Sequence, residues 1–484
     1  MKLESLIKTK KAKIAVIGLG YVGLPTAVEL AENGFRVFGI DIKKERVDLV
    51  NKGKSFVPDV SSEDLKKIVN SGRLKAFNNH QPLKKSDIVL ICVPTPLDKN
   101  KIPDISYIVS TTEEIVKYLR PGQLIILESS TYPGATKEII LPKLKERGFK
   151  VGKDFFLAHC PERIDPGNEK YKLKDVSRVV GGITKKCTKL ATQFYQSFIK
   201  ARVFPLSSSE AAEMTKILEN TFRLVNISMI NELALLCGRM GIDIWEVIEA
   251  AKTKPYGFMP FYPSPKCSGH CIPLVPFFLS YKAREYNFWT RFIDLAGEIN
   301  EQMPHYIMTK VIWVLNLKGK PVRGAKVLVW GVSYKKDIGD TRESAAFDVI
   351  ADLIRKGAKT DYFDPFVKKL SIKHRILKKP VVLKSIKYSP KKIKEYDLVL
   401  ILTDHSGFHY PSKAKGGKEN IVLFDYEKLR ETFIYKVRIV TIPLQSDAHT
   451  LAIRERTNIL ENSRQDICQN RVDSLWFPPV HQML

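Results

Sequence analysis

Three glycines near the start of the chain, Gly18, Gly20 and Gly23, have the spacing of a phosphate-binding turn. They follow the apolar run 14–17 and open a segment with helical periodicity. In a strand, turn and helix of this kind, the first glycine permits the turn and the second lets a pyrophosphate approach the backbone. The third lets the helix pack closely. Asp41 ends the next expected strand, where its carboxylate would bind ribose hydroxyls and repel a 2′-phosphate. We therefore predict a dinucleotide site that takes NAD rather than NADP.

A second group of reactive side chains lies in segment 264–276, which is rich in glycine, proline and cysteine. The chain has 7 cysteines, an odd number that does not suit a disulfide framework, so a special cysteine is expected to act as a thiolate. In a glycine-containing loop a cysteine is suited to nucleophilic attack. A buried structural cysteine is a second interpretation. A metal site of Cys267, His270 and Cys271 is a third, but the sequence lacks the second ligand cluster that such sites usually need, and we predict no metal.

Lys216 and Asn220 lie four residues apart in a long stretch with helical periodicity, 210–240. Residues at this spacing share one face of a helix. An ammonium and an amide donor on that face could stabilise an oxyanion that develops on a substrate. An ordinary solvated helix face would carry the same residue types, and the spacing alone does not separate the two interpretations.

The pattern of the whole chain predicts the elements that position these groups. Short apolar strands alternate with helical segments before residue 205 and again after residue 325, which indicates parallel, doubly wound sheets. Helical periodicity dominates between them, over 210–240 and 283–317. We predict an α/β fold with two Rossmann-like doubly wound domains joined by a central helical domain. The expected boundaries are 1–205 (NAD-binding), 206–308 (central), 309–444 (C-terminal) and 445–484, a tail to which we assign no structure or chemistry.

Composition and charge limit the remaining possibilities. With 484 residues, of which 44% are hydrophobic and 27% charged, the chain has the balance of a multidomain globular protein. It has no apolar stretch near the ~20 residues that span a bilayer, and its lysine-rich start lacks the apolar core of a signal peptide. We expect a cytoplasmic protein without membrane contact. The formal net charge of +27 suits an anionic partner, but no nucleic-acid recognition motif accompanies it, so we expect no nucleic acid.

Several further motifs occur in a fixed order between about residues 10 and 440. Besides the glycine turn and the helix with Lys216 and Asn220, they are 93–96 (VPTP), 128–134 (ESSTYPG), 161–168 (PERIDPGN), 269–273 (GHCIP), 334–337 (YKKD) and 342–344 (RES). The sequence thereby resembles the UDP-glucose/GDP-mannose dehydrogenase family, and within it the enzymes acting on UDP-N-acetylglucosamine. Members oxidise the C6 alcohol of a nucleotide sugar to a carboxylate, using two NAD and releasing no aldehyde. The resemblance implies a UDP-sugar substrate, NAD as cofactor, a part in surface polysaccharide biosynthesis, and at least a homodimer formed through the central domain.

The resemblance also implies roles for single residues. Cys271 would be the nucleophile, passing through a thiohemiacetal and a thioester, while Lys216 and Asn220 stabilise the oxyanion. Glu162 and Thr131 would place or activate the hydrolytic water. The implied cofactor contacts are Gly18, Gly20, Tyr21, Val22, Gly23, Asp41, Arg46, Thr95 and Arg342. The implied substrate contacts are Lys335, Gly269, Glu162, Lys216 and Asn220.

Two features depart from the family pattern. The loop before the nucleophile has Ser264, Lys266, Cys267 and Ser268 where the pattern has Gly, Gly, Leu and Gly, so side chains stand where backbone would pass the substrate. Val275 replaces an aspartate thought to assist acid–base chemistry, and a valine cannot accept a proton. A catalytically impaired protein that binds a nucleotide sugar or NAD is therefore a second hypothesis. UDP-glucose and UDP-N-acetylmannosamine remain open as substrates.

Overall fold

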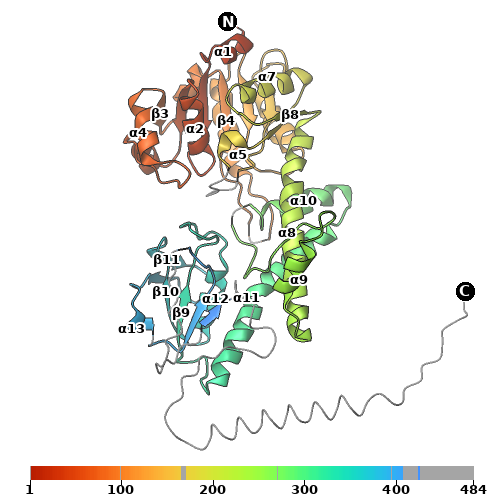
Figure 1. The fold of residues 1–484 in the computed structure, drawn as a ribbon. Helices are drawn as coiled ribbons and strands as arrows, with labels where there is room; N and C mark the ends of the chain where they lie inside the picture. Colours follow the sequence, from red (N-terminus) through yellow and green to blue (C-terminus); the bar gives the residue numbers. More distant parts are fainter. Residues whose placement is uncertain are drawn as a thin grey trace, which may run out of the picture. The chain divides into compact units, whose positions relative to one another are not determined.

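The computed structural model describes residues 2–98, 100–164, 171–269, 271–393 and 395–406, together with a short strand at 423–425. The described helices are α1 (Leu3–Lys8), α2 (Gly23–Glu32), α3 (Lys44–Asn51), α4 (Ser62–Asn70), α5 (Ser106–Tyr118), α6 (Leu141–Lys145), α7 (Lys185–Gln196), α8 (Ser209–Met240), α9 (Ile244–Ala251), α10 (Val275–Ala283), α11 (Arg291–Leu317), α12 (Ala345–Arg355) and α13 (Pro390–Ile393) (Figure 1). The strands are β1 (Lys13–Ile17), β2 (Arg36–Ile40), β3 (Leu74–Phe77), β4 (Ile88–Ile91), β5 (Leu124–Leu127), β6 (Phe156–His159), β7 (Arg178–Gly182), β8 (Val203–Leu206), β9 (Lys326–Trp330), β10 (Lys359–Phe363), β11 (Lys369–Ile372), β12 (Val381–Lys384), β13 (Leu398–Ile401) and β14 (Leu423–Asp425). The expected tail 445–484 lies outside the described residues.

The first sheet has eight strands in the order β3-β2-β1-β4-β5-β6-β7-β8. Neighbouring strands are parallel except for β6 and β7, which run antiparallel. The strand order reverses direction between β1 and β4. At such a switch point the loops after the two strands diverge from the carboxyl edge, where ligands of doubly wound sheets bind.

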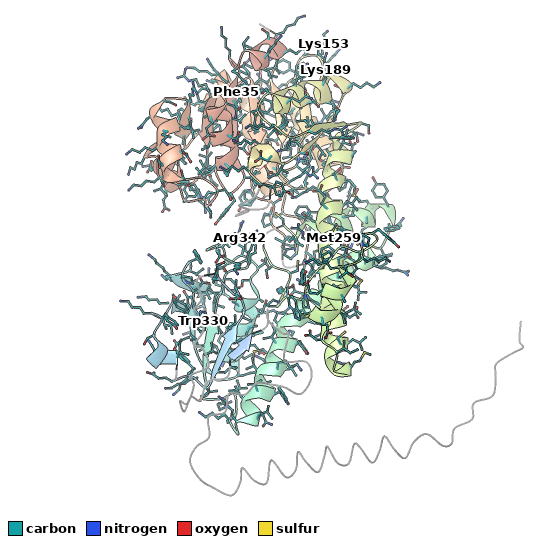
Figure 2. All side chains as sticks on the ribbon, in the orientation of Figure 1. Phe35, Lys153, Lys189, Met259, Trp330 and Arg342 are labelled. Carbon is teal, nitrogen blue, oxygen red and sulfur yellow. The ribbon has the colours of Figure 1, made fainter. Side chains whose placement is uncertain are left out.

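Both faces of this sheet are buried, which explains why its strands are continuous apolar runs. Ile14 and Val16 of β1 join one hydrophobic cluster, while Ala15 and Ile17 join another. This alternation follows from the two-residue period of a strand. Figure 2 labels Phe35, a fully buried ring of the first of these clusters.

The central part of the chain is helical. Helix α8 is 32 residues long and begins after Ser208, whose side chain accepts a hydrogen bond from the amide of Ala211. It ends at Gly241, which has the left-handed conformation common at helix ends. The expected helix over 283–317 is wrong in one respect, because helix α11 begins only at Arg291. Phe288 and Trp289 extend the apolar pattern before it, but they are exposed loop residues.

The second sheet has the parallel order β10-β9-β13-β14. Val327 and Val329 of β9 face one cluster, and Leu328 and Trp330 face the other; Figure 2 labels Trp330. Between β10 and β13 the chain forms a separate antiparallel pair, β11 and β12. The expectation of two doubly wound sheets and a helical centre is confirmed, with the antiparallel pairs as additions.

Candidate active site

The turn between β1 and α2 has the close approaches that its glycine spacing predicts. Gly18 has a φ of 94°, and a Cβ there would lie 2.5 Å from the carbonyl oxygen of Cys92. A Cβ on Gly23 would lie 1.9 Å from the carbonyl oxygen of Gly18. At Gly20, in contrast, no described atom lies within 4 Å of such a Cβ. The backbone is therefore open at the position where a pyrophosphate would approach the start of α2, and the turn fits a dinucleotide.

Asp41 ties the end of β2 to this turn. Its Oδ2 accepts a hydrogen bond from the Leu19 amide over 2.9 Å, and its Oδ1 accepts one from the Lys43 amide over 2.8 Å. Arg46 Nη1 lies 3.4 Å from Oδ2. A fixed carboxylate at the end of the second strand is the feature that binds ribose hydroxyls in such folds. The structure thus places both expected residues, Asp41 and Arg46, beside the turn.

The loops after the neighbouring strands β4 and β5 contact each other at the carboxyl edge of the first sheet, next to the switch point. Thr95 Oγ1 donates to the carbonyl oxygen of Ser130 over 2.7 Å. The neighbouring Thr131 has a buried hydroxyl oxygen without a hydrogen-bond partner among the described residues. Because a buried hydroxyl without a partner is unfavourable, this group is available to a ligand or a water.

Glu162 follows β6 and is held by a buried ion pair that the sequence analysis missed. Arg178 Nη2, in a side chain that is 1% exposed, lies 2.7 Å from Glu162 Oε2. The amides of Arg163 and Ile164 each donate to Oε1 over 2.8 Å. The arginine charge and the two amides therefore hold the carboxylate in one orientation. The signal in the sequence was a lone arginine at the start of the apolar strand β7.

Glu213 on helix α8 holds the loop after β5, and it was also missed. Its carboxylate accepts hydrogen bonds from the amides of Gly134 (2.6 Å) and Thr136 (2.9 Å) and from the Thr136 hydroxyl (2.6 Å). Burial raises the pKa of Glu213 to about 7, against the opposing effect of these hydrogen bonds. Lys216 lies three residues later and Asn220 seven, so all three share one helix face. That spacing could have identified Glu213.

The expected pair on α8 is buried. Lys216 is 7% exposed and Asn220 is 8% exposed, which contradicts the interpretation as a solvated helix face. Within the described part of the chain, Lys216 has no ion-pair partner and Asn220 Nδ2 has no hydrogen-bond partner. One turn further along α8, Leu224 packs against Cys267 of the loop before the nucleophile. The buried Asn220 amide without an acceptor and the neighbouring Lys216 ammonium without an ion-pair partner form a site for an oxygen atom of a ligand.

The loop before Cys271 is fastened to the central helices by two asparagines. Asn300 Oδ1 accepts from the Cys267 amide over 2.5 Å, and its Nδ2 donates to the Cys267 carbonyl over 3.1 Å. Asn231 Oδ1 accepts from the Ser264 amide over 2.8 Å. Burial raises the pKa of the Cys267 thiol to about 12, which makes it a structural cysteine, whereas Cys271 is exposed.

No hydrogen bond joins the Cys271 thiol to another expected catalytic residue among those described. The residues of the described ranges also include no cluster of three His, Cys, Asp or Glu side chains that could hold a metal ion. The suggested metal ligand His270 lies outside the described residues.

Val275 is a packing residue. It is the first residue of α10, and its amide donates to the Cys271 carbonyl over 2.9 Å. Its side chain is 3% exposed. It belongs to an apolar cluster with Tyr132, Ala135, Ile217 and Phe278. Val275 therefore contributes packing and has no group that could accept a proton.

Arg342 reaches the glycine-rich turn from the C-terminal part of the chain. Its guanidinium carbon lies 4.5 Å from the centre of the Tyr21 ring. Asp340 holds the guanidinium through Nε (3.0 Å) and Nη2 (2.6 Å). The Arg342 carbonyl oxygen accepts a hydrogen bond from the Gly269 amide over 3.2 Å. Gly269 has a φ of 91°, which favours glycine, and a Cβ there would lie 3.0 Å from the Tyr334 ring. The structure brings together three residues that the resemblance assigned to cofactor and substrate.

A buried histidine organises the carboxyl edge of the second sheet. His405 Nε2 lies 3.1 Å from Asp364 Oδ2 and 3.3 Å from Ser333 Oγ. Burial raises the pKa of Asp364, but hydrogen bonds from His405 and the Val332 amide outweigh it and leave this pKa below its usual value. The Ser333 hydroxyl also donates to the carbonyl oxygen of Lys335 over 2.9 Å. Lys335 thus lies in a loop fixed at the switch point between β9 and β13.

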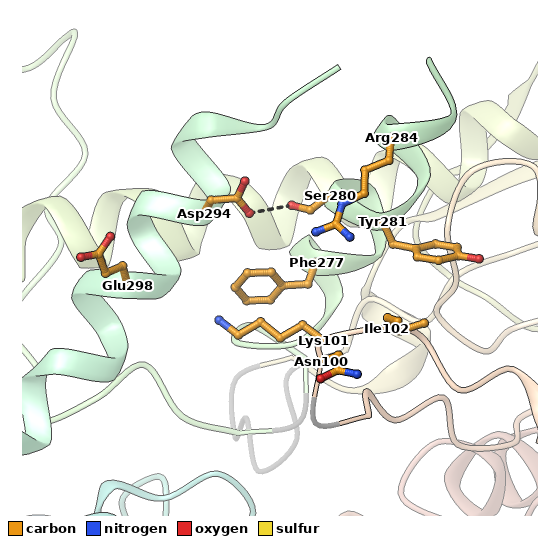
Figure 3. Close-up of a pocket in the computed structure, with 9 residues that line it drawn as sticks. All are labelled: Asn100, Lys101, Ile102, Phe277, Ser280, Tyr281, Arg284, Asp294 and Glu298. Carbon is orange, nitrogen blue, oxygen red and sulfur yellow. Dashed lines mark hydrogen bonds between the residues drawn. The ribbon is translucent and has the colours of Figure 1, made fainter. Parts of the chain in front are cut away.

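A cavity of about 350 Å³ does not coincide with these residues (Figure 3). It is lined by Asn100, Lys101, Ile102, Phe277, Ser280, Tyr281, Arg284, Asp294 and Glu298. Figure 3 shows Ser280 bonded to Asp294, and Lys101 Nζ lies 4.0 Å from the centre of the Phe277 ring. None of the expected site residues lines this cavity.

Three family models match successive parts of the chain. They describe the UDP-glucose/GDP-mannose dehydrogenase family: its NAD binding domain at residues 12–199, its central domain at 210–302 and its UDP binding domain at 328–431. The chain belongs to this family. It is a nucleotide-sugar dehydrogenase homologue whose cofactor is NAD.

Curated relatives of this family member fall into two groups by name. A UDP-N-acetyl-D-glucosamine 6-dehydrogenase of Pseudomonas aeruginosa is 34% identical, over 87% of this chain and 97% of the relative. A UDP-N-acetyl-D-mannosamine dehydrogenase of Pyrococcus horikoshii is 35% identical, over 85% of this chain and 94% of the relative.

Solved structures agree with this assignment. The structure of the P. horikoshii UDP-N-acetylmannosamine dehydrogenase has a TM-score of 0.77 at 33% identity, over 86% of this chain and 96% of that one. A UDP-N-acetyl-mannosamine dehydrogenase of Staphylococcus aureus has a TM-score of 0.72 at 30% identity, over 87% of this chain and all of that one. A search of the described helices finds none long and apolar enough to cross a membrane.

Proposed function

We propose that this chain is an NAD-dependent 6-dehydrogenase that oxidises the C6 alcohol of UDP-N-acetylglucosamine to the carboxylate. The observation that carries the proposal is the face of α8 on which, among the described residues, the buried Asn220 Nδ2 lacks an acceptor and Lys216 lacks an ion-pair partner. Leu224 connects this face to the loop of the exposed Cys271. Such a face offers a substrate oxygen two donors and its carbon a thiol nucleophile.

The residues of the first sheet fit the cofactor. Bound NAD supplies the chemistry of accepting a hydride from C6 of the sugar. The open backbone at Gly20 and the start of α2 would hold its pyrophosphate, and Asp41 would accept hydrogen bonds from its ribose. Thr95 and Arg342 would border it from the β4 loop and from the C-terminal part of the chain.

The chain's own residues carry the covalent steps. After the first hydride has left C6, the Cys271 thiolate attacks the aldehyde carbon and forms a C–S bond. Lys216 and Asn220 stabilise the negative charge on the oxygen. A second hydride leaves the same carbon, which gives a thioester. Glu162, oriented by Arg178, accepts a proton from the water that attacks the thioester, and the C–S bond breaks to release the thiolate. One alcohol, one water and two NAD yield one carboxylate, two NADH and three protons.

UDP-N-acetylmannosamine is a second candidate substrate. Relatives named for the two sugars match this chain at nearly the same identity, 34% and 35%. The two sugars differ only in configuration at C2, so their reaction at C6 uses the same residues. Assays with both sugars decide between them.

The hypothesis of an impaired homologue has less support. It depended on the altered loop 264–268 and on Val275 as the site of a missing base, and the second ground is weakened because Val275 packs in an apolar cluster while Glu162 is the oriented carboxylate. We therefore propose that turnover does not require a carboxylate at position 275.

We also propose that the chain forms a homodimer through α8. Large apolar side chains recur on this helix at spacings of three, four and seven residues, so they form one stripe. All are between 39% and 61% exposed: Leu218, Phe222, Met229, Leu233, Leu236 and Met240. Exposed apolar stripes of this length are typical of subunit interfaces. Light scattering should give the mass of a dimer, and Leu236→Glu should shift it toward the monomer.

The enzyme proposal is tested by NADH formation with purified protein, NAD and each UDP-sugar. We expect steady formation of two NADH per sugar oxidised, and loss of this yield in Cys271→Ser. A burst that stops after one turnover would mean that the thioester forms but is not hydrolysed, which supports the impaired homologue. Binding of a UDP-sugar and NAD without any NADH would overturn the proposal.

A further inference from the structure

Lys266 is a buried lysine in the loop that leads to Cys271, at a position where the family pattern has glycine. Its side chain is 5% exposed. Its Nζ lies 3.1 Å from Asp348 Oδ2 on helix α12 and 3.3 Å from a carboxylate oxygen of Glu301 on helix α11. A buried ammonium is tolerated only with such partners, so this side chain has a single well-defined place.

The ion pair continues into the C-terminal sheet region. The other oxygen of Asp348, Oδ1, lies 3.0 Å from His374 Nε2, just after β11. Glu343 also acts electrostatically on Lys266. Burial lowers the pKa of the Lys266 ammonium, but Asp348 and Glu301 outweigh it and leave the pKa above its ordinary value. Lys266 therefore stays charged throughout the neutral pH range.

The backbone around Lys266 has few other ties to the C-terminal part of the chain. Cys267 is bonded to Asn300 of α11, which is a central helix. The Gly269 amide donates to the Arg342 carbonyl, but over 3.2 Å. Directly before these two anchors, the Lys266 side chain forms an ion pair from the loop to α12.

We propose that Lys266 is a positioning residue that fixes the loop of Cys271 to helix α12 through Asp348. A glycine at this position can make no such link. In this chain the ion pair between Lys266 and Asp348 thereby holds the nucleophile loop against the region next to the second sheet. The positioning is independent of the proposed function, and only its kinetic consequence rests on that function.

Lys282 supplies a matched control. It is equally buried, 6% exposed in its side chain, and pairs with two carboxylates, Glu138 (2.7 Å) and Glu285 (2.6 Å). It lies outside the loop. Lys266→Met and Lys282→Met therefore remove the same kind of interaction at two places, and only the first should affect the loop.

The first readout is amide hydrogen exchange of the full-length protein, measured on peptides that cover residues 261–271. We expect Lys266→Met and Lys266→Gly to accelerate exchange there about tenfold, because both carboxylates are partly exposed and the link is of moderate strength. Lys282→Met should leave these peptides unchanged. Unchanged exchange in Lys266→Met, or equal acceleration in Lys282→Met, overturns the proposal.

A second variant covers the case in which Lys266→Met fails to fold. Asp348→Asn leaves Lys266 its pair with Glu301 and should accelerate loop exchange by a smaller factor, whereas His374→Gln should not. The double variant Lys266→Met/Asp348→Asn should exchange no faster than Lys266→Met alone, since both changes break the same link. If the two substitutions accelerate loop exchange additively, Lys266 and Asp348 do not act through one ion pair, and the proposal is overturned.

Kinetics give the second readout. If the chain turns over a UDP-sugar, kcat of Lys266→Met should fall about tenfold while KM for NAD stays unchanged, because a displaced nucleophile affects the covalent step. A change confined to KM for NAD, or an unchanged kcat despite faster loop exchange, overturns the catalytic part of the proposal. Absence of any turnover in the unsubstituted protein would count against the proposed function. The hydrogen-exchange data would still test the positioning role of Lys266 in that case.

Discussion

Replacing Val275 by aspartate restores the family residue at a position that this chain uses for packing. Burial of a valine side chain contributes about 1.5–3 kcal/mol, and an aspartate in the first turn of α10 regains about 0.3–1 kcal/mol from the helix dipole. The uncharged Val275→Asn lacks this charge–dipole gain and should therefore lower the free energy of unfolding by about 1.5–3 kcal/mol. Val275→Asp carries an additional cost of burying charge in the cluster of Tyr132 and Phe278.

The charge cost depends on pH. Burial in an apolar cluster raises the folded-state pKa of the new carboxyl above its unfolded value of about 3.9. The folded state then holds more protons than the unfolded state between these two pKa values, so stability falls as pH rises through that window. At pH 7 the cost is capped at about 4 kcal/mol by protonation of the carboxyl, at ~1.4 kcal/mol per pH unit. Since water can reach part of the loop, we expect a difference of about 1–3 kcal/mol between Val275→Asp and Val275→Asn.

Denaturant unfolding of both variants at pH 4.5 and pH 7 measures this difference, and NADH assays run in parallel. The two variants should agree at the lower pH and separate at the higher one. Turnover of Val275→Asp should not exceed that of the unsubstituted chain, because Glu162 already supplies the base. Equal stability of the two variants at pH 7, or turnover raised tenfold or more by the aspartate, would refute the reasoning that residue 275 only packs.

Gly20→Ala should fold but weaken NAD binding in fluorescence titrations, whereas Gly23→Ala should fail to yield folded protein, since its Cβ would lie 1.9 Å from a backbone oxygen. Lys216→Met should keep the thermal midpoint and lower kcat by about 10²–10³; an unchanged kcat would remove Lys216 from the site. Burial raises the pKa of Glu213 in the folded protein to about 7, from an ordinary value of 4.5. Between these pH values the folded state binds more protons than the unfolded state, so the free energy of unfolding declines as pH rises, by on the order of 3 kcal/mol. Glu213→Gln should flatten this decline in midpoints recorded from pH 4.5 to 8, and a decline as steep as in the unsubstituted chain would assign it to another group.

The sequence predicted those parts of the fold and site that depend on local pattern. Strands β1, β2 and β9, the turn with Gly18 and the long helix α8 follow from short-range periodicity and glycine spacing. The pair Lys216 and Asn220 follows in the same way, since residues four apart on a helix must share a face.

Features that depend on contacts distant in sequence were not predictable. Arg178 meets Glu162 from the next strand, and Asp348 meets Lys266 across 82 residues. The sequence of an apolar strand does not predict that β7 pairs antiparallel with β6, because both strand directions bury the same residues. In the sequence, Val275 indicated the loss of a carboxylate that could act as a base. Only its contacts in the structure identify it as a packing residue.

The link from Lys266 to Asp348, together with the bond from Gly269 to Arg342, bears on how this chain can be divided. A fragment that ends after α11 would contain Cys271, Lys216 and the entire first sheet, yet it would leave a desolvated ammonium with half of its counter-charge. Limited proteolysis between α11 and β9 should therefore release pieces that separate poorly, and the sequence-defined units would behave as one cooperative body under denaturant.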